Sequence, residues 1–128
     1  MDYREIVMDD VAELAKKELA KYDREVFGIL NLNVKGQVIN FNEVSIGSLC
    51  STETHPREVF KSSILSNAGS IIAIHNHPSG DPTPSEADIL CTKRLKEAGE
   101  ILGIPLLDHI IVGSGTDREY SFKANGNM

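Results

Sequence analysis

The apolar run SIIAIHN, residues 70–76, constrains the fold of this chain more than any other segment. Its β-branched residues are bounded by Gly69 and Pro78, a pattern that is typical of a buried strand. Such a strand belongs inside a sheet, where its backbone groups find hydrogen-bond partners. The rest of the chain is therefore expected to supply further strands and helices.

A helix signal and a hairpin signal precede this run. Residues 10–22, DVAELAKKELAKY, place apolar side chains at three- and four-residue spacing, with acids early and lysines late. This pattern predicts an amphipathic helix. Residues 26–33 are mostly apolar, residues 38–46 alternate, and the VKGQ between them supplies a turn, so these segments are expected to form an antiparallel hairpin.

Helix and strand signals continue to the end of the chain. After a polar loop, Pro56 suits the first turn of a helix that we expect to run to about Ala68. A further helix is predicted over 85–102, a strand over 106–113, and a short strand at EYSF, 119–122. This order of elements predicts an α/β sandwich, although the order of the strands in the sheet does not follow from it.

Length and composition describe a single globular domain over residues 1–128. Hydrophobic residues make up 41% and charged residues 25% of the chain, as in ordinary globular proteins. No apolar run approaches the roughly 18 residues of a membrane span, and the start lacks a signal-peptide pattern, so we expect a cytoplasmic protein without a membrane partner. The net charge of −6 argues against direct nucleic-acid binding, because such binding needs basic surfaces.

The two cysteines, Cys50 and Cys91, form no C-x-x-C motif. Neither a redox pair nor a thiolate zinc knuckle is therefore expected. We interpret both residues as free thiols that serve packing.

Two histidines stand two residues apart at the end of the buried strand. Side chains on a strand repeat with a period of two, so His75 and His77 are expected on one face, roughly 6.5 to 7 Å apart at Cα, and Asn76 on the other. Two imidazoles at this separation can bind one cation, and the carboxyl ends of strands are common ligand sites. The alternative is that one histidine is a satisfied core residue and the other is solvated.

Asp88 has two interpretations. Ser85 and Asp88 fit the S-x-x-D capping box, in which both side chains bind N–H groups at a helix start. Alternatively, Asp88 projects toward His75 and His77 at the end of a loop that three prolines make rigid. Two histidines and one carboxylate would leave an open fourth position, the arrangement of a catalytic zinc site.

A catalytic zinc site also needs a general base. No glutamate lies between the histidines, as it does in H-E-x-x-H, so the base must come from elsewhere in the chain. The candidate is Glu25, immediately before the strand at 26–33, although an acid in such a position is ordinarily a solvated strand-end residue.

Together these residues resemble a known signature. The pattern H-x-H-P, six residues, S-x-x-D, with an upstream E-x-x-G, is similar to the JAMM or MPN+ metalloprotease motif. The segments HPREVF, HNHPSGDPTPS and LLDHIIVG are similar to the RadC branch of that family, whose members have long been labelled as DNA repair proteins. The resemblance covers about residues 25–122. It implies a cytidine-deaminase-like three-layer sandwich, the JAMM/MPN fold, with a central mixed β-sheet flanked by helices.

The resemblance also implies a site and a reaction. One Zn²⁺ would be bound by His75, His77 and Asp88, and Glu25 would be the general acid/base. Ser85 would stabilise the oxyanion of a tetrahedral intermediate. The implied reaction is hydrolysis of a peptide or isopeptide bond in a substrate that the sequence does not identify.

Two parts of the family pattern have no counterpart here. Full-length RadC proteins carry an N-terminal helix-hairpin-helix segment, and the 24 residues before Glu25 are too few and too acidic for one. No insertion is long enough to hold ubiquitin, as insertions do in deubiquitinating members. The substrate, the oligomeric state and any role in DNA repair are therefore left open.

Two further residues and two further functions have to be considered. His55 is expected to be structural at a helix start, or else to line the cleft, and Asp108 is a candidate to orient a ligating imidazole. Instead of a hydrolase, the chain could be a catalytically silent or accessory metal-binding module of DNA-processing or mobile-element systems. A metal-dependent nuclease is the third possibility, which the acidic charge disfavours.

Overall fold

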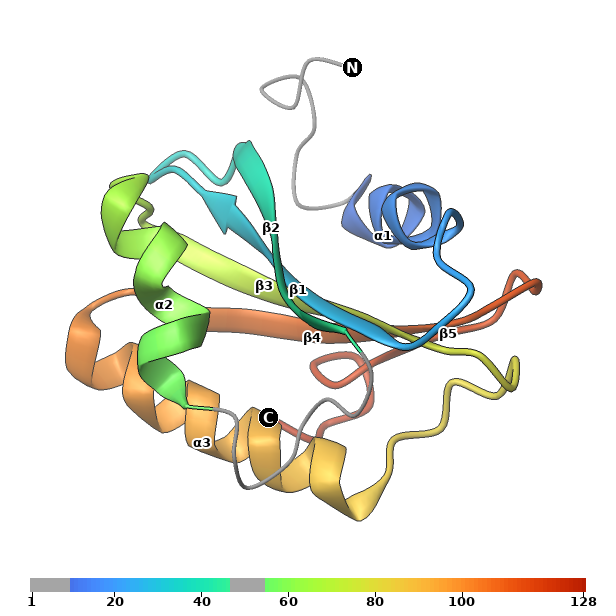
Figure 1. Cartoon of the computed structure of the whole chain (residues 1–128). Helices are drawn as coiled ribbons and strands as arrows, with labels where there is room; N and C mark the ends of the chain where they lie inside the picture. Colours follow the sequence, from blue (N-terminus) through green and yellow to red (C-terminus); the bar gives the residue numbers. More distant parts are fainter. Residues whose placement is uncertain (1–9, 47–54) are drawn as a thin grey trace.

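The computed structural model describes residues 10–46 and 55–128 as a three-layer α/β sandwich (Figure 1). One helix, α1, covers one face of the sheet, and α2 and α3 cover the other. The predicted fold class is confirmed. The elements in chain order are α1 (Val11–Leu19), β1 (Val26–Leu32), β2 (Val38–Ile46), α2 (Pro56–Leu65), β3 (Ser70–His77), α3 (Glu86–Leu102), β4 (Leu106–Gly113) and β5 (Glu119–Ser121).

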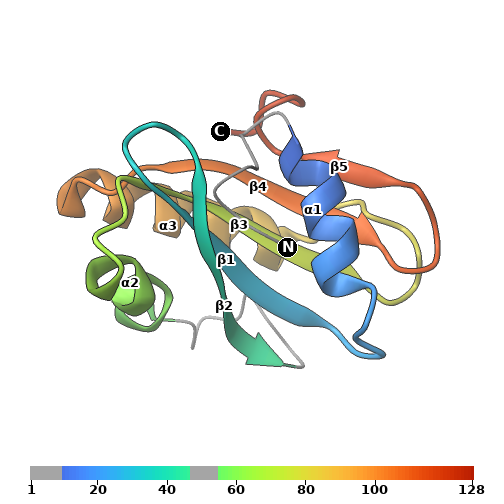
Figure 2. The same cartoon turned by 90° about the horizontal axis from the view of Figure 1, so that it is seen from above.

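The five strands form one mixed sheet in the order β2-β1-β3-β4-β5. β1 runs antiparallel to both β2 and β3, whereas β3 and β4 are parallel and α3 connects them (Figure 2). Because β1 and β3 are antiparallel, the start of β1 lies beside the end of β3, and Phe27 pairs with His75. This pairing brings Glu25 to the edge of the sheet where the two histidines emerge.

The strand β3 divides its side chains between two hydrophobic clusters. Ile72 and Ile74 pack toward α1, and Ile71 and Ala73 pack toward α2 and α3. This alternation is the period of two expected of a strand that is buried on both faces. It continues beyond the apolar residues, so His75 and His77 lie on the side of α2 and α3.

Two helices end earlier than the sequence pattern predicts. α1 was expected to reach Tyr22 but ends at Leu19, and the Tyr22 hydroxyl donates a 2.8 Å hydrogen bond to Glu43 on β2. α2 was expected to reach Ala68 but ends at Leu65, because Asn67 adopts a left-handed conformation with φ of 54° that a helix cannot contain.

Some expectations concern residues outside the described ranges, namely Cys50, most of the polar loop before Pro56, and residues 1–9. Cys91 is free and buried in the cluster under α2 and α3, as expected of a packing thiol. None of the helices in residues 10–46 and 55–128 is both long enough and apolar enough to cross a membrane.

Candidate metal centre

Four of the predicted site residues converge at the end of β3. The ligand atoms of Glu25, His75 and His77 lie within 4.8 Å of one another. The Asp88 carboxylate joins them, with Oδ2 3.2 Å from His77 Nε2 and Oδ1 3.6 Å from His75 Nε2. Glu25 Oε1 lies 3.2 Å from His75 Nε2. Glu25, His75 and His77 are thus the three groups whose ligand atoms all lie close enough to hold one ion, and the Asp88 carboxylate lies beside the two imidazoles.

The depth of these side chains differs. The side chains of His75 and Asp88 are almost inaccessible, at 0% and 5% exposed, and His77 is 15% exposed. Glu25, at 32%, is the most accessible of the four. His75 and Asp88 therefore form the buried part of the cluster, and Glu25 lies on its solvent-accessible side.

Of the two interpretations of Asp88, the capping box is observed, and the same carboxylate also lies beside the histidines. The capping box of α3 is present: the Ser85 N–H donates to Asp88 Oδ2 at 2.8 Å, and the Asp88 N–H donates to Ser85 Oγ at 3.1 Å. The same carboxylate faces both histidines, and its second oxygen, Oδ1, points to His75. The capping box therefore holds the carboxylate in place for the histidines instead of competing with them.

Asp88 and His77 also shift each other's pKa. Burial alone would raise the pKa of Asp88, but the hydrogen bond to His77, the charge of His75 and the bonds from Ser85 outweigh burial and hold it well below its usual range. The Asp88 hydrogen bond raises the pKa of His77 against the opposing effect of burial. In the metal-free protein the pair is therefore an ion pair at mildly acidic pH.

The loop after β3 orients the His77 ring. His77 Nδ1 lies 2.9 Å from the Asp81 carbonyl oxygen, which can only accept, so the proton is on Nδ1 and Nε2 is left for a ligand. The loop itself is held by the His77 carbonyl, which accepts from Gly80 N–H at 3.0 Å and from Ser114 N–H at 3.1 Å. Gly113 packs against it so closely that a Cβ there would overlap the Gly80 carbonyl group.

Asn76, between the two histidines, points to the opposite face as predicted and fastens the segment that carries Glu25. Its Oδ1 accepts from Val26 N–H at 2.7 Å, and its Nδ2 donates to the Arg24 carbonyl at 3.0 Å and to Ser114 Oγ at 3.2 Å. The backbone on both sides of Glu25 is thus tied to β3. Sequence reasoning gave Asn76 no function, because the contact depends on the pairing of β1 with β3.

The glycine of the E-x-x-G pattern has a packing role. A Cβ at Gly28 would overlap the ring of Phe41 and lie 2.9 Å from the Asn42 carbonyl oxygen, both on β2. The pairing of β1 and β2 also shifts register between Phe27 and Gly28. Gly28 therefore allows β2 to cross closely over the start of β1, three residues from Glu25.

The neighbour of His75 is His109 and not Asp108. His75 Nδ1 lies 3.0 Å from His109 Nε2, and His109 Nδ1 lies 2.6 Å from Thr92 Oγ1. His109 is fully buried, and burial followed by the charge of His75 holds its pKa well below its usual range. Sequence reasoning missed this contact, because only the register that pairs Ala73 with His109 brings the two rings together.

The Asp108 carboxylate serves the far edge of the sheet instead. It accepts hydrogen bonds from Ser121 Oγ at 2.6 Å and from the backbone N–H groups of His109 and Lys123 at 2.7 and 3.0 Å. The reason is the alternation of β4, which turns Asp108 away when His109 faces His75. His55 is the exposed N-cap residue of α2, and its side chain does not cap the helix.

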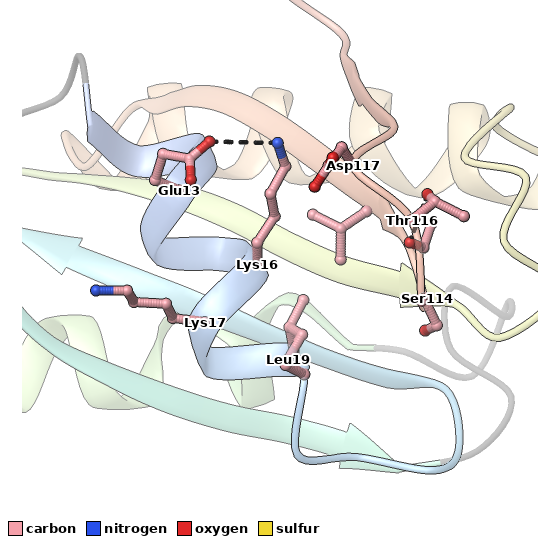
Figure 3. A pocket seen from close by; sticks show the side chains of 11 residues that line it. Glu13, Lys16, Lys17, Leu19, Ser114, Thr116 and Asp117 are labelled. Atoms are coloured by element: carbon pink, nitrogen blue, oxygen red, sulfur yellow. Dashed lines mark hydrogen bonds and ion pairs between the residues drawn. The ribbon is translucent and has the colours of Figure 1, made fainter.

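Among the described residues, two of the larger hollows lie away from the histidines. One, of about 510 Å³, lies between α1 and the turn after β4, on the opposite face of the sheet, where Lys16 pairs with Glu13 at 3.3 Å (Figure 3). The other, of about 600 Å³, is an apolar groove between α2 and α3 that includes the exposed side chains of Leu65 and Ile101. Neither hollow is lined by Glu25, His75, His77 or Asp88.

Comparison with known proteins agrees with this architecture. The model of the RadC-like JAB domain family matches residues 7–127, and the chain belongs to that family. A UPF0758 protein of Syntrophomonas wolfei is 54% identical over 109 residues, which are 85% of this chain and 46% of that protein. One of Moorella thermoacetica is 57% identical over 106 residues, 83% of this chain and 46% of that protein. The chain thus spans about half the length of these relatives.

The donor set fits a zinc ion. Imidazole nitrogen and carboxylate oxygen are ordinary zinc ligands, and two histidines with one carboxylate are the three protein ligands of many catalytic sites. The bond to the Asp81 carbonyl keeps a proton on His77 Nδ1, so Nε2 is the nitrogen that can bind an ion once it gives up the proton that it donates to Asp88. The cluster is therefore a candidate metal centre.

Proposed function

We propose that this domain is a zinc-dependent hydrolase of the JAMM type that cleaves peptide or isopeptide bonds. The observation that carries the proposal is the convergence of Glu25 and Asp88 on the Nε2 atoms of His75 and His77. Membership in the RadC-like JAB domain family supports it. The substrate is a protein or peptide, and the acidic chain does not bind nucleic acid directly.

The four residues divide into ligands and a base by their burial. His75, His77 and Asp88 bind the metal, because Asp88 is buried and its Oδ1 faces His75. Glu25, the most exposed of the four, acts on the substrate side. Zinc held there supplies Lewis acidity toward a carbonyl oxygen and toward water.

The protein side chains move the protons. Glu25 accepts a proton from the attacking water as the new C–O bond forms, and gives it to the leaving nitrogen as the C–N bond breaks. The Ser85 hydroxyl accepts from Asp88 N–H through its oxygen, so its own hydrogen remains free to donate to the oxyanion. No net proton is gained or lost by the protein in the cycle.

The first test measures the metal. We expect the purified chain to bind about one zinc ion per molecule by mass spectrometry, and His77→Ala and Asp88→Ala to lose it. His55→Ala is the matched control, because it removes an exposed histidine outside the cluster and leaves zinc in place. A parent chain that binds no zinc after reconstitution would contradict the proposal and favour an accessory module.

The second test separates the base from the ligands. We expect Glu25→Gln to retain zinc and to lose hydrolysis of the best substrate from a peptide and isopeptide library, by a factor of about 10² to 10⁴. Loss of zinc in Glu25→Gln would make Glu25 a ligand, and unchanged turnover would remove its role as the base. Cleavage of DNA or RNA that disappears in His77→Ala would indicate a nuclease instead.

A further inference from the structure

A line of buried polar groups runs from the metal centre into α3. It begins at His75 Nδ1, which is 3.0 Å from His109 Nε2, and continues from His109 Nδ1 to Thr92 Oγ1 at 2.6 Å. Thr92 Oγ1 then donates to the Asp88 carbonyl oxygen at 2.8 Å. His75, His109 and Thr92 are each no more than 2% exposed, so the three groups are shielded from water.

The direction of these hydrogen bonds follows from counting protons. The Thr92 hydroxyl has one hydrogen, which goes to the Asp88 carbonyl, so its oxygen accepts from His109 Nδ1–H. A neutral imidazole has one N–H, so His109 Nε2 accepts from His75 Nδ1–H. When His75 is neutral, its Nε2, on the side of Asp88 and Glu25, is then the nitrogen without a proton.

We infer that His109 and Thr92 are positioning residues that hold His75 in the tautomer able to bind metal through Nε2. This inference deepens the proposed function and rests on it. Neither residue touches the substrate or the ion: His109 acts through the His75 ring, and Thr92 acts through His109. The contact is of the kind that orients metal-ligating histidines, with an imidazole in place of the usual carboxylate or carbonyl.

The opposite direction would block the site. If the Thr92 hydroxyl donated to His109 Nδ1, His109 Nε2–H would donate to His75 Nδ1, and the His75 proton would move to Nε2. That proton would point at Glu25 Oε1, 3.2 Å away, and no lone pair would remain for a metal. The acceptor that Thr92 offers to His109 therefore selects between a metal-binding and a metal-excluding arrangement.

Two aromatic side chains fix the orientation of the His109 ring between Thr92 and His75. Phe122 stacks on it with a centroid distance of 4.7 Å and an interplanar angle of 5°, and Phe27 meets it edge-on at 5.8 Å. Phe27 also contacts the His75 ring, with centroids 6.1 Å apart. These apolar contacts leave Thr92 and His75 as the hydrogen-bond partners of the two His109 nitrogens.

The test compares zinc affinity by competition with a chromophoric chelator in three variants. Thr92→Val keeps the shape of the side chain but removes the acceptor, and we expect a loss of about 10- to 100-fold in zinc affinity. Thr92→Ser restores the hydroxyl and most of the affinity. Leu95→Val is the control, because it trims a buried residue of the same helix that lies in the hydrophobic cluster, and it should leave zinc affinity unchanged.

A second readout reports the tautomers directly. In long-range ¹H–¹⁵N spectra we expect His109 to carry its proton on Nδ1 in both the zinc-loaded and the zinc-free parent. A proton on His109 Nε2 would overturn the inference, as would zinc affinity in Thr92→Val equal to that of the parent. A purely structural effect would lower zinc affinity equally in Leu95→Val and Thr92→Val, and Thr92→Ser would not restore it. That result would also overturn the inference.

The outcomes for the two proposals can be told apart. If the parent binds zinc but hydrolyses nothing, the proposed function fails and the affinity series still supports or overturns the role of Thr92. If the parent binds no zinc, the proposed function fails, and the His109 tautomer in the zinc-free protein decides the inference by itself.

Discussion

The hydrogen bonds of Asn76 allow a quantitative prediction about how Glu25 is held. Asn76→Ala removes three hydrogen bonds, of 2.7, 3.0 and 3.2 Å, from a side chain that is 1% exposed. Each neutral bond contributes about 1 kcal/mol, and the buried Val26 N–H left without an acceptor costs a further 1 to 3 kcal/mol or so. We expect the free energy of unfolding in urea to fall by about 4 to 6 kcal/mol.

The local effect is the sharper part of this prediction. Without Asn76, the backbone around Glu25 detaches from β3, so the Val26 amide should exchange with solvent at least tenfold faster in the folded state. The metal ligands are unchanged, so we expect Asn76→Ala to retain zinc while hydrolysis falls because Glu25 is displaced. Hydrogen exchange by NMR measures the first effect, and mass spectrometry the second.

Asn31 supplies the matched control. It is also a fully buried asparagine, on β1, and its Nδ2 donates to Asn40 Oδ1 at 2.7 Å and to Ser62 Oγ at 3.0 Å. Asn31→Ala should lower stability without increasing exchange at Val26, since Asn31 lies near the far end of the strand. Equal protection of the Val26 amide from exchange in Asn76→Ala and the parent would refute the reasoning. An equal loss of that protection in Asn76→Ala and Asn31→Ala would refute it as well.

Four further results are expected. Ser85→Ala removes the hydroxyl that caps the Asp88 N–H, so urea titration should show a loss of about 1 kcal/mol while zinc content is unchanged; loss of zinc would contradict this. Gly113→Ala forces a Cβ against the Gly80 carbonyl group, and thermal unfolding should show about 1 to 3 kcal/mol of destabilisation together with weaker zinc binding. In the metal-free protein, the stability difference between the parent and His77→Gln should be largest between about pH 4 and 6.5. It should shrink at higher pH, as His77 with its raised pKa loses its proton, and at lower pH, as Asp88 with its lowered pKa gains one; a difference constant from pH 4 to 9 would exclude the ion pair. Zinc at 100 times its Kd should stabilise the parent by about 2.7 kcal/mol in calorimetry, and chelation should abolish this gain, which His77→Gln should never show.

The parts of the fold that depend on local pattern could be predicted from the sequence. The β-branched run before His75 is a strand, and Ser85 caps α3 as its motif predicts, because both signals act over a few residues. The ends of α1 and α2 could not be predicted. Tyr22 lies beyond the end of α1 and bonds to Glu43 on β2, and Asn67 adopts a left-handed conformation after α2. The strand order also depends on pairing between segments that are distant in the chain.

The same distinction applies to the candidate site. The common face of His75 and His77 follows from the period of a strand, so it was predictable without a partner. The contact between His75 and His109 required the parallel register of β3 and β4, which no short pattern contains. Asp108 was the more obvious orienting residue because of its charge, but the phase of β4 directs it to Ser121.

Asp88 contributes two groups from the first turn of α3, its carboxylate to the cluster and its carbonyl to Thr92. Fraying of that one turn would withdraw both together, and with them the hydrogen bond from Ile89 N–H to the Ser85 carbonyl at 3.1 Å. Metal departure and opening of the helix start would then be a single event. The lifetime of the bound ion would be set by how often one helical turn unwinds. The hydrogen-exchange rate of the Ile89 amide would then report that lifetime.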